Sequence, residues 1–136
     1  MADAALDALL TDWTVDPNGA KNAFLAFRDH LRKPAISFSV KARPGISYSL
    51  RAKHAKQTGR ELFVLIDVID DDPDNRWLSV CFYADMVTDP DSLADYVPMG
   101  LMGEDACCFS LDSPDASLTQ YIMERLDEAL LNAGRA

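Results

Sequence analysis

The chain lacks the features that would place it in a membrane, outside the cell or in a disulfide-stapled fold. Its longest apolar run, residues 62–66, is far shorter than the roughly 20 residues of a membrane-spanning helix. The N-terminus lacks the basic flank and apolar stretch of a signal peptide. The cysteines, Cys81, Cys107 and Cys108, are odd in number and lack C-x-x-C spacing, so we expect structural cysteines without a disulfide scaffold. These absences predict a soluble, cytoplasmic protein that does not enter a membrane.

Motifs for metal and phosphate chemistry are also absent. The aspartate-rich loop at 70–75 has alternating carboxylates, but Asn75 and Cys81 stand where an EF-hand needs glycine and glutamate. Gly100 and Gly103 are not followed by the Lys-Ser or Lys-Thr pair of a phosphate-binding loop. The sequence therefore predicts no metal site, no cofactor and no set of catalytic residues.

Length and composition fit one domain. The chain has 136 residues, of which 49% are hydrophobic and 26% are charged, which is typical of a globular domain with a single core. We expect one domain over residues 1–136, in which residues 1–15 form either a short helix or a loosely docked arm. The 22 acidic residues outnumber the 13 Lys and Arg, and the net charge of −9 argues against a general nucleic-acid binder.

Hydrophobic periodicity predicts both helices and strands. Apolar residues recur at helical spacing over residues 19–32, and again from Asp115 to Gly134. Strict alternation on both sides of a Pro-Gly turn predicts an antiparallel hairpin, and a second hairpin follows it. The predicted strands are 36–41, 46–52, 62–69, 77–83 and 106–111.

These elements predict an α+β fold. Its mostly antiparallel sheet has about five strands, two hairpins plus a late strand, with an N-terminal helix and a long C-terminal helix packed on one face. Residues 62–69 are almost continuously apolar, which is typical of a central strand covered on both faces. Asp89 and Pro90 indicate the start of a short helix that ends before Pro98, and a flexible apolar loop follows at 98–103.

Charge is divided unevenly along the chain. Residues 28–60 contain nine basic residues, one acidic residue and both histidines, for a formal charge of +8. Residues 61–136 carry −14, and residues 1–27 carry −3. Such asymmetry suggests a recognition surface, here for an acidic partner or a small anion. The alternative is that the acidic second half folds over the basic segment and pairs with it.

Alternation in the first hairpin places polar side chains on one face. Arginine offers a planar fork of donors and serine adds adjustable hydrogen bonds, so such a face can hold an anion. The bland interpretation is a solvated face whose cations pair loosely with nearby acids. The face comprises Ser37, Ser39, Lys41, Ser47, Ser49 and Arg51, and the candidate ligand-binding residues are Lys41, Arg43, Ser47, Ser49, Arg51 and His54.

Two other functions stay open beside the leading one, a small cytoplasmic binding module. Asp67 is the one charged residue in an apolar strand, and either it pairs with Lys41 or Arg51, or it acts as the acid or base of a small enzyme with His54 or a serine. A homo-oligomeric protein, such as a homodimer, would bring the basic surface of one copy to the acidic half of another.

The C-terminal half also carries a resemblance. A strand at 62–66, a loop and a strand at 78–83 precede Cys108-Phe109-Ser110-Leu111-Asp112-Ser113-Pro114, which leads into the last helix. This arrangement resembles small bacterial YdhG-like domains of unknown function, which place a Phe-x-Leu-Asp-x-Pro-type strand end before their last helix. The resemblance implies a bacterial α+β domain and transfers no catalytic residue.

Overall fold

The computed structural model describes residues 3–135, which form three helices and six strands. The helices are α1 (Ala4–Asp12), α2 (Ala20–Leu31) and α3 (Ala116–Ala133). The strands are β1 (Ile36–Arg43), β2 (Ser47–His54), β3 (Val64–Ile69), β4 (Trp77–Tyr83), β5 (Asp95–Leu101) and β6 (Glu104–Leu111).

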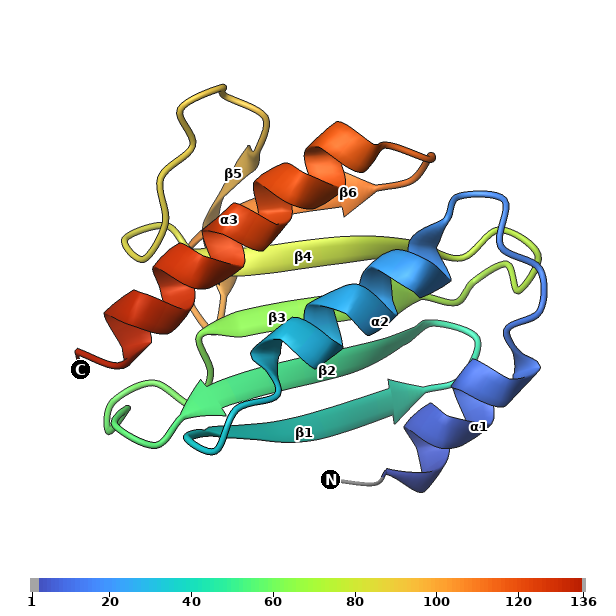
Figure 1. Cartoon of the computed structure of the whole chain (residues 1–136), viewed down its shortest axis with the longest axis horizontal. Helices are drawn as coiled ribbons and strands as arrows, with labels where there is room; N and C mark the ends of the chain where they lie inside the picture. Colours follow the sequence, from blue (N-terminus) through green and yellow to red (C-terminus); the bar gives the residue numbers. More distant parts are fainter. Residues whose placement is uncertain (1–2, 136) are drawn as a thin grey trace.

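All six strands belong to one sheet in the order β1-β2-β3-β4-β6-β5, and every neighbouring pair is antiparallel. Helices α2 and α3 lie across the same face of this sheet (Figure 1). Within residues 3–135 no helix covers the opposite face, which we call the open sheet face. The predicted α+β fold, with helices on one face of a mostly antiparallel sheet, is confirmed.

Local signals position the two covering helices. The Asp16 carboxylate accepts hydrogen bonds from the backbone N–H groups of Ala20 and Lys21, at 2.9 and 3.1 Å, and so caps the first turn of α2. Gly19 before this helix has a φ of 67°, which glycine adopts without the Cβ penalty of other residues. At α3 the Asp115 carboxylate accepts from the N–H of Leu118. Both caps satisfy backbone donors that the first turn of a helix leaves unpaired.

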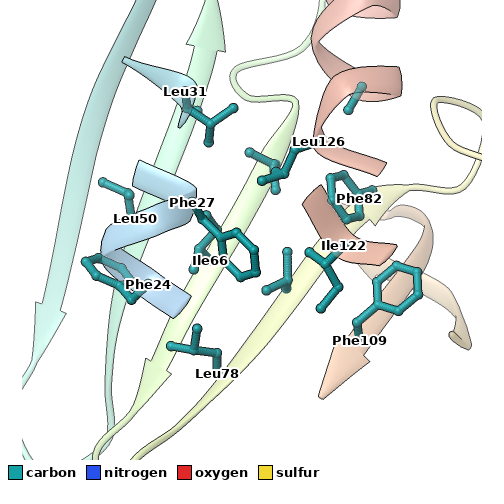
Figure 2. Packing of buried hydrophobic residues seen from close by; sticks show 14 of the residues in the cluster. Phe24, Phe27, Leu31, Leu50, Ile66, Leu78, Phe82, Phe109, Ile122 and Leu126 are labelled. Atoms are coloured by element: carbon teal, nitrogen blue, oxygen red, sulfur yellow. The ribbon is translucent and has the colours of Figure 1, made fainter. Parts of the chain in front are cut away.

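The core fills the layer between the helices and the sheet. Phe24, Phe27 and Leu31 of α2, with Ile122 and Leu126 of α3, point toward the sheet, and all five are buried. The residues that meet them from the strands include Leu50, Ile66, Leu78, Phe82 and Phe109 (Figure 2). Each buried side chain of this size contributes about 1.5–3 kcal/mol through removal of apolar surface from water.

The N-terminal segment is a docked helix rather than a loose arm. Leu6, Leu9 and Trp13 are buried, and they belong to the same core cluster as the rest of the domain. The Asp3 side chain accepts from the N–H of Leu6 and caps α1. Met1 and Ala2, which the prediction for residues 1–15 included, lie outside the described residues.

The predicted short helix at 89–97 and loop at 98–103 are wrong, because β5 occupies Asp95–Leu101. The Asp89 carboxylate does accept from backbone N–H groups, of Leu93 and Ala94, but the helix does not continue. Strand β6 offers a free edge, and pairing with it outweighs the local helix signal. The pairing is irregular between Val97 and Leu101, so alternation did not reveal this strand.

Strand β3 is central, but it is not covered on both faces as its apolar run predicted. Val64, Ile66 and Val68 are fully buried under the helices. Leu65, Asp67 and Ile69 point the other way and are partly exposed on the open sheet face. The open face therefore holds apolar side chains that the described part of the chain leaves half covered.

The expectation of structural cysteines without a disulfide scaffold did not include the one bond that the structure shows. Cys81 of β4 and Cys108 of β6 face each other in the sheet register, with their Cα atoms 4.1 Å apart, and they form a disulfide. Because β4 pairs with β6 rather than β5, the sequence spacing of 27 residues gave no sign of this pairing. Cys107, the next residue, is a free thiol. As to membranes, none of the described helices has the length and hydropathy to cross a bilayer.

Candidate functional site

The open sheet face collects the polar residues that the sequence placed on one side of the first hairpin. In the register, Lys41 lies opposite Ser49, and Ser49 lies opposite Asp67. Arg43 is aligned with Ser47, and Ser39 with Arg51. Five of the six candidate residues therefore share one surface on β1 and β2, directed away from the helices: Lys41, Arg43, Ser47, Ser49 and Arg51.

His54 is the candidate that the structure does not bring to this surface. It has the same parity along β2 as Leu50 and Ala52, which are buried on the helix side. Its Nδ1 accepts from the backbone N–H of Lys56 at 3.1 Å. Asp67 and His54 therefore lie on opposite faces of the sheet and do not form an acid–base pair.

Lys53, and not His54, lies on the open sheet face at this end of β2. Lys53 is absent from the candidates that the sequence predicts. It follows Arg51 by two positions on β2 and lies opposite Ser37 of β1. The same alternation that selected Arg51 was the signal that would have found it. Four cations thus line the basic half of the open face, namely Lys41, Arg43, Arg51 and Lys53.

None of these four cations has a carboxylate within 4.0 Å in the part of the chain that the structure describes. The acidic second half therefore does not fold over this hairpin and neutralise it. Arg51 also lacks a neutral partner at one donor: its Nε–H is buried and has no hydrogen-bond acceptor among residues 3–135. An unsatisfied donor of this kind is uncommon in folded proteins.

Two serines form the floor of this surface. Ser47 and Ser49 are each only 4% exposed, although their strand borders an uncovered face. Ser47 Oγ accepts a hydrogen bond of 3.1 Å from Nη2 of Arg43, which holds that guanidinium against the sheet. Ser49 Oγ donates to the Asp67 carboxylate. The two serines thus hold the side chains of Arg43 and Asp67 in place on the open sheet face.

Asp67 is the single carboxylate at the centre of this arrangement. Burial raises its pKa above the usual value of 3.8, while the Ser49 hydrogen bond and the charges of Arg43 and Arg51 act in the opposite direction. The expectation of a pairing partner on a neighbouring strand is met by a hydroxyl group rather than by a cation. The carboxylate therefore reduces the positive potential of the face without cancelling it.

Apolar side chains continue the open sheet face beyond the cations. Leu65 and Ile69 flank Asp67 on β3, and Trp77 lies opposite Ile69 on β4. The Cys81–Cys108 disulfide lies in the row of Leu65. A ligand on this face would thus meet charge on β1 and β2 and a half-exposed apolar strip on β3 and β4.

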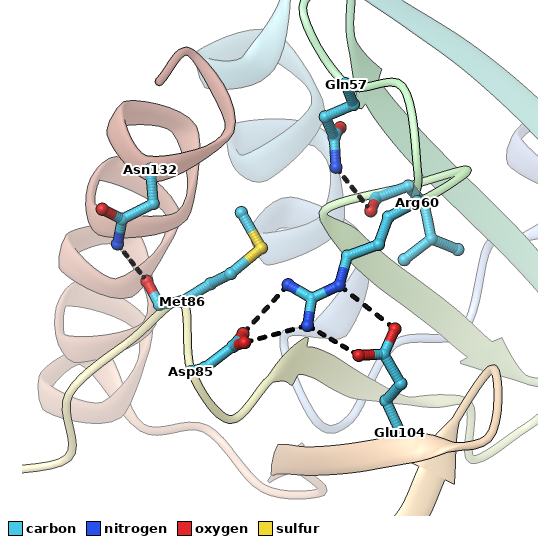
Figure 3. Close-up of polar contacts among 7 residues, drawn as sticks. Gln57, Arg60, Asp85, Met86, Glu104 and Asn132 are labelled. Atoms are coloured by element: carbon cyan, nitrogen blue, oxygen red, sulfur yellow. Dashed lines mark hydrogen bonds and ion pairs between the residues drawn. The ribbon is translucent and has the colours of Figure 1, made fainter. Parts of the chain in front are cut away.

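Arg60 belongs to the same basic stretch of sequence, but it is paired internally. Its guanidinium donates to both oxygens of Asp85, each at 2.9 Å, and to Glu104 at 2.7 and 3.1 Å (Figure 3). It also stacks over the Tyr83 ring, with 4.0 Å between its Cζ and the ring centroid. These contacts hold the pKa of Arg60 well above its usual value.

A surface cavity of about 370 Å³ lies beside this cluster. It is bounded by the 57–60 loop, by Asp85 and Met86, and by the end of α3. Asn132 donates to the Met86 carbonyl and Gln57 donates to the Leu62 carbonyl, so both amides are occupied by the fold (Figure 3). The cavity therefore offers few free polar groups, and the open sheet face is the better candidate site.

The first carboxylate of the aspartate-rich loop at 70–75 has a structural role. Asp70 is buried and accepts from the N–H of Gly45 and from Arg76, which ties the two hairpins together. No group of three or more His, Cys, Asp or Glu residues that could hold a metal ion occurs in the described ranges.

Comparisons with protein-family models, curated proteins and solved structures found no match for the chain. The resemblance to YdhG-like domains stays a prediction.

Proposed function

We propose that the protein is a binding module that recognises an acidic partner or a small anion through the basic half of its open sheet face. The observation that carries the proposal is the absence, within residues 3–135, of any carboxylate paired with Lys41, Arg43, Arg51 or Lys53. Other arginines of the chain, such as Arg60 and Arg76, are engaged by two carboxylates each.

The arrangement suits oxyanions for three reasons. Guanidinium groups bind carboxylate, sulfate and phosphate oxygens through two parallel N–H donors. The side chains project from adjacent strands of a rigid sheet, so no backbone segment has to be ordered when a ligand binds. Ser47 and Ser49 already hold Arg43 and Asp67 in place, so the face is organised before a ligand arrives.

The test compares two double variants with equal loss of charge. Lys41→Ala/Arg51→Ala removes two cations from the open face, and Lys33→Ala/Lys56→Ala removes two exposed cations that lie in loops outside it. Binding of sulfate and of a glutamate-rich peptide is measured by isothermal titration calorimetry for each protein. The sulfate arm reports a small-anion site, and the peptide arm reports an acidic partner.

We expect the Lys41→Ala/Arg51→Ala variant to bind at least one probe about tenfold more weakly than the unmodified chain, equivalent to roughly 1.4 kcal/mol. The Lys33→Ala/Lys56→Ala control should stay within about twofold, because both side chains are exposed in loops outside the strands, where salt screens their charge. Equal affinities in both variants would show that net charge, and not this face, attracts the anion, and would contradict the proposal.

A further inference from the structure

A second surface of the molecule is apolar and acidic, whereas the open sheet face is basic on β1 and β2. Eight large hydrophobic side chains are exposed in the described part of the chain, and five of them fall within residues 93–102. These five line β5 and its flanking loops at the sheet edge farthest from β1, and they lie on both sides of that edge, since Tyr96 and Val97 are adjacent in β5 and face opposite ways. We call them the β5 surface: Leu93, Tyr96, Val97, Met99 and Met102.

The β5 surface is held in place rather than loose. Asp105 accepts from the Tyr96 hydroxyl and from the backbone N–H of Met99. Met99 and Met102 have φ values of 57° and 53°, in the left-handed region that residues other than glycine rarely adopt. At Met102 the positive φ belongs to the two-residue turn with Gly103 that joins β5 to β6. At Met99 the hydrogen bond to Asp105 holds the backbone in this conformation. The two methionine side chains are 72% and 52% exposed, so the strained backbone presents them to solvent.

A groove continues the β5 surface along the start of α3. It has a volume of about 350 Å³ and lies between Asp91 and Leu93 on one side and the first turns of α3 on the other. Leu118 and Tyr121 supply an apolar lining from α3. Two carboxylates, those of Asp91 and Asp115, stand at its walls.

The exposed charge around this surface is negative, because the neighbouring cation Arg125, which lies over the Tyr121 ring, is buried and paired with Glu128. Residues 77–124 contain nine Asp and Glu and no Lys or Arg. Asp91 and Asp95 are exposed, and neither has a cation within 4.0 Å among residues 3–135. An apolar sheet edge with unpaired carboxylates on both of its sides complements a ligand that covers the edge with apolar anchors flanked by cations.

We propose that the β5 surface and its groove dock a basic, amphipathic peptide segment of a partner protein. Leucine-like anchors of the segment would pack on the methionines, whose flexible thioether side chains adapt to irregular apolar shapes. Lys or Arg residues of the segment would pair with Asp91 and Asp95. Pro98 has no N–H to offer an added strand, so recognition relies on side chains more than on extension of the sheet.

This inference is independent of the proposed function. The β5 surface lies at the opposite edge of the sheet from β1 and β2 and selects ligands of the opposite charge. The other occupant with suitable chemistry is a second copy of this chain, which would present its own basic open sheet face. Self-association through the β5 surface would count against the proposal.

The probe is a fluorescein-labelled peptide of about 12 residues that alternates Leu and Lys, measured by fluorescence anisotropy at about 0.15 M salt. One matched peptide has Glu in place of Lys, and another has Ser in place of Leu. We expect the Leu-Lys peptide to bind at least about tenfold more tightly than either matched peptide, because only it offers both anchors and cations. Equal binding of the Ser-Lys peptide would reveal general attraction to an acidic protein and overturn the proposal.

Variants locate the binding. Met99→Asn/Met102→Asn keeps residues that tolerate a positive φ, and should weaken binding about tenfold. Val15→Asn/Leu131→Asn changes two exposed apolar residues elsewhere and should leave affinity within about twofold. Asp91→Asn/Asp95→Asn should likewise weaken binding of the Leu-Lys peptide about tenfold. Its control, Asp71→Asn/Asp74→Asn in the β3–β4 loop, should leave the affinity within about twofold. Sedimentation runs alongside, and a dimer that Met99→Asn/Met102→Asn converts to a monomer would assign the surface to a second copy instead.

Discussion

Arg76 and Asp70 form a buried ion pair that joins three parts of the chain. The Arg76 Nε lies 2.6 Å from Oδ1 of Asp70, and the two side chains are 5% and 7% exposed. Asp70 also accepts from the N–H of Gly45 in the β1–β2 turn, and Arg76 reaches Asp12 at the end of α1 with its Nη2, at 3.2 Å. The pair therefore ties the turn of the basic hairpin to β4 and to the N-terminal helix.

Removing one member of this pair should be strongly destabilising. Arg76→Ala leaves the Asp70 carboxylate buried without its cation, and such a change costs about 3–5 kcal/mol of unfolding free energy. Urea denaturation monitored by circular dichroism measures the loss. Arg32→Ala is the control, because its contact with Asp29 is 3.8 Å long and exposed, and it should cost less than about 1 kcal/mol. Similar losses in both variants would contradict a special role for the buried pair.

Most of this fold could be predicted from the sequence, because in most segments the hydrophobic periodicity agrees with the secondary structure that forms. The period-two alternation at Ile36–Arg43 and Ser47–His54 corresponds to strands whose apolar side faces the helices. Strand β5 escaped prediction because its side chains are nearly all exposed and its pairing contains an irregularity, so no alternation marks it. Its existence depends on the free edge of β6, which is tertiary information.

Alternation predicts part of the candidate site, and the charge distribution supplies the rest. Lys41, Ser49 and Arg51 were placed together because side chains two apart share a strand face. His54 is a candidate because it lies in the basic stretch of residues 28–60, and its position along β2 places it on the helix side. The role of Asp70 depends on a contact across 25 residues with Gly45, which no local pattern reports.

Reduction of the Cys81–Cys108 disulfide should lower stability. The bond closes a loop of 27 residues, and disulfides of this kind stabilise by about 2–4 kcal/mol, chiefly by restricting the unfolded chain. We expect the urea midpoint to fall on treatment with dithiothreitol. Cys81→Ser/Cys108→Ser, which has no bond to reduce, should be insensitive to the reductant. An unchanged midpoint for the unmodified chain would contradict the prediction.

Cys107 should be a slow nucleophile despite being the free thiol. Burial raises its pKa, and the nearby Asp89 carboxylate adds to the effect, so little of the reactive thiolate forms at neutral pH. Alkylation by iodoacetamide at pH 7, followed by mass spectrometry, should proceed at least about tenfold more slowly than in the urea-unfolded chain. Equal rates in the folded and unfolded chain would show that the thiol is exposed and not shifted.

Asp67 should make both stability and anion binding depend on pH. Because burial raises its pKa, the folded chain holds a proton at this carboxyl more tightly than the unfolded chain does. The stability from this group is fully present below the unfolded value of 3.8 and is lost as the pH rises through the higher folded pKa. Protonation also removes the one negative charge among Lys41, Arg43 and Arg51, so lower pH favours an anion on the open sheet face.

Asp67→Asn separates this effect from every other titrating group. The amide keeps an oxygen that accepts from the Ser49 hydroxyl, and it carries no charge at any pH. Sulfate, whose charge is constant between pH 4 and 7, is titrated into both proteins by calorimetry across that range. We expect the variant to bind sulfate up to about tenfold more tightly at pH 7, and the difference to shrink as the pH falls and Asp67 becomes neutral. If the two proteins bind equally at pH 7, the anion does not lie near Asp67, and the ligand site must be sought away from the β1–β3 part of the open sheet face.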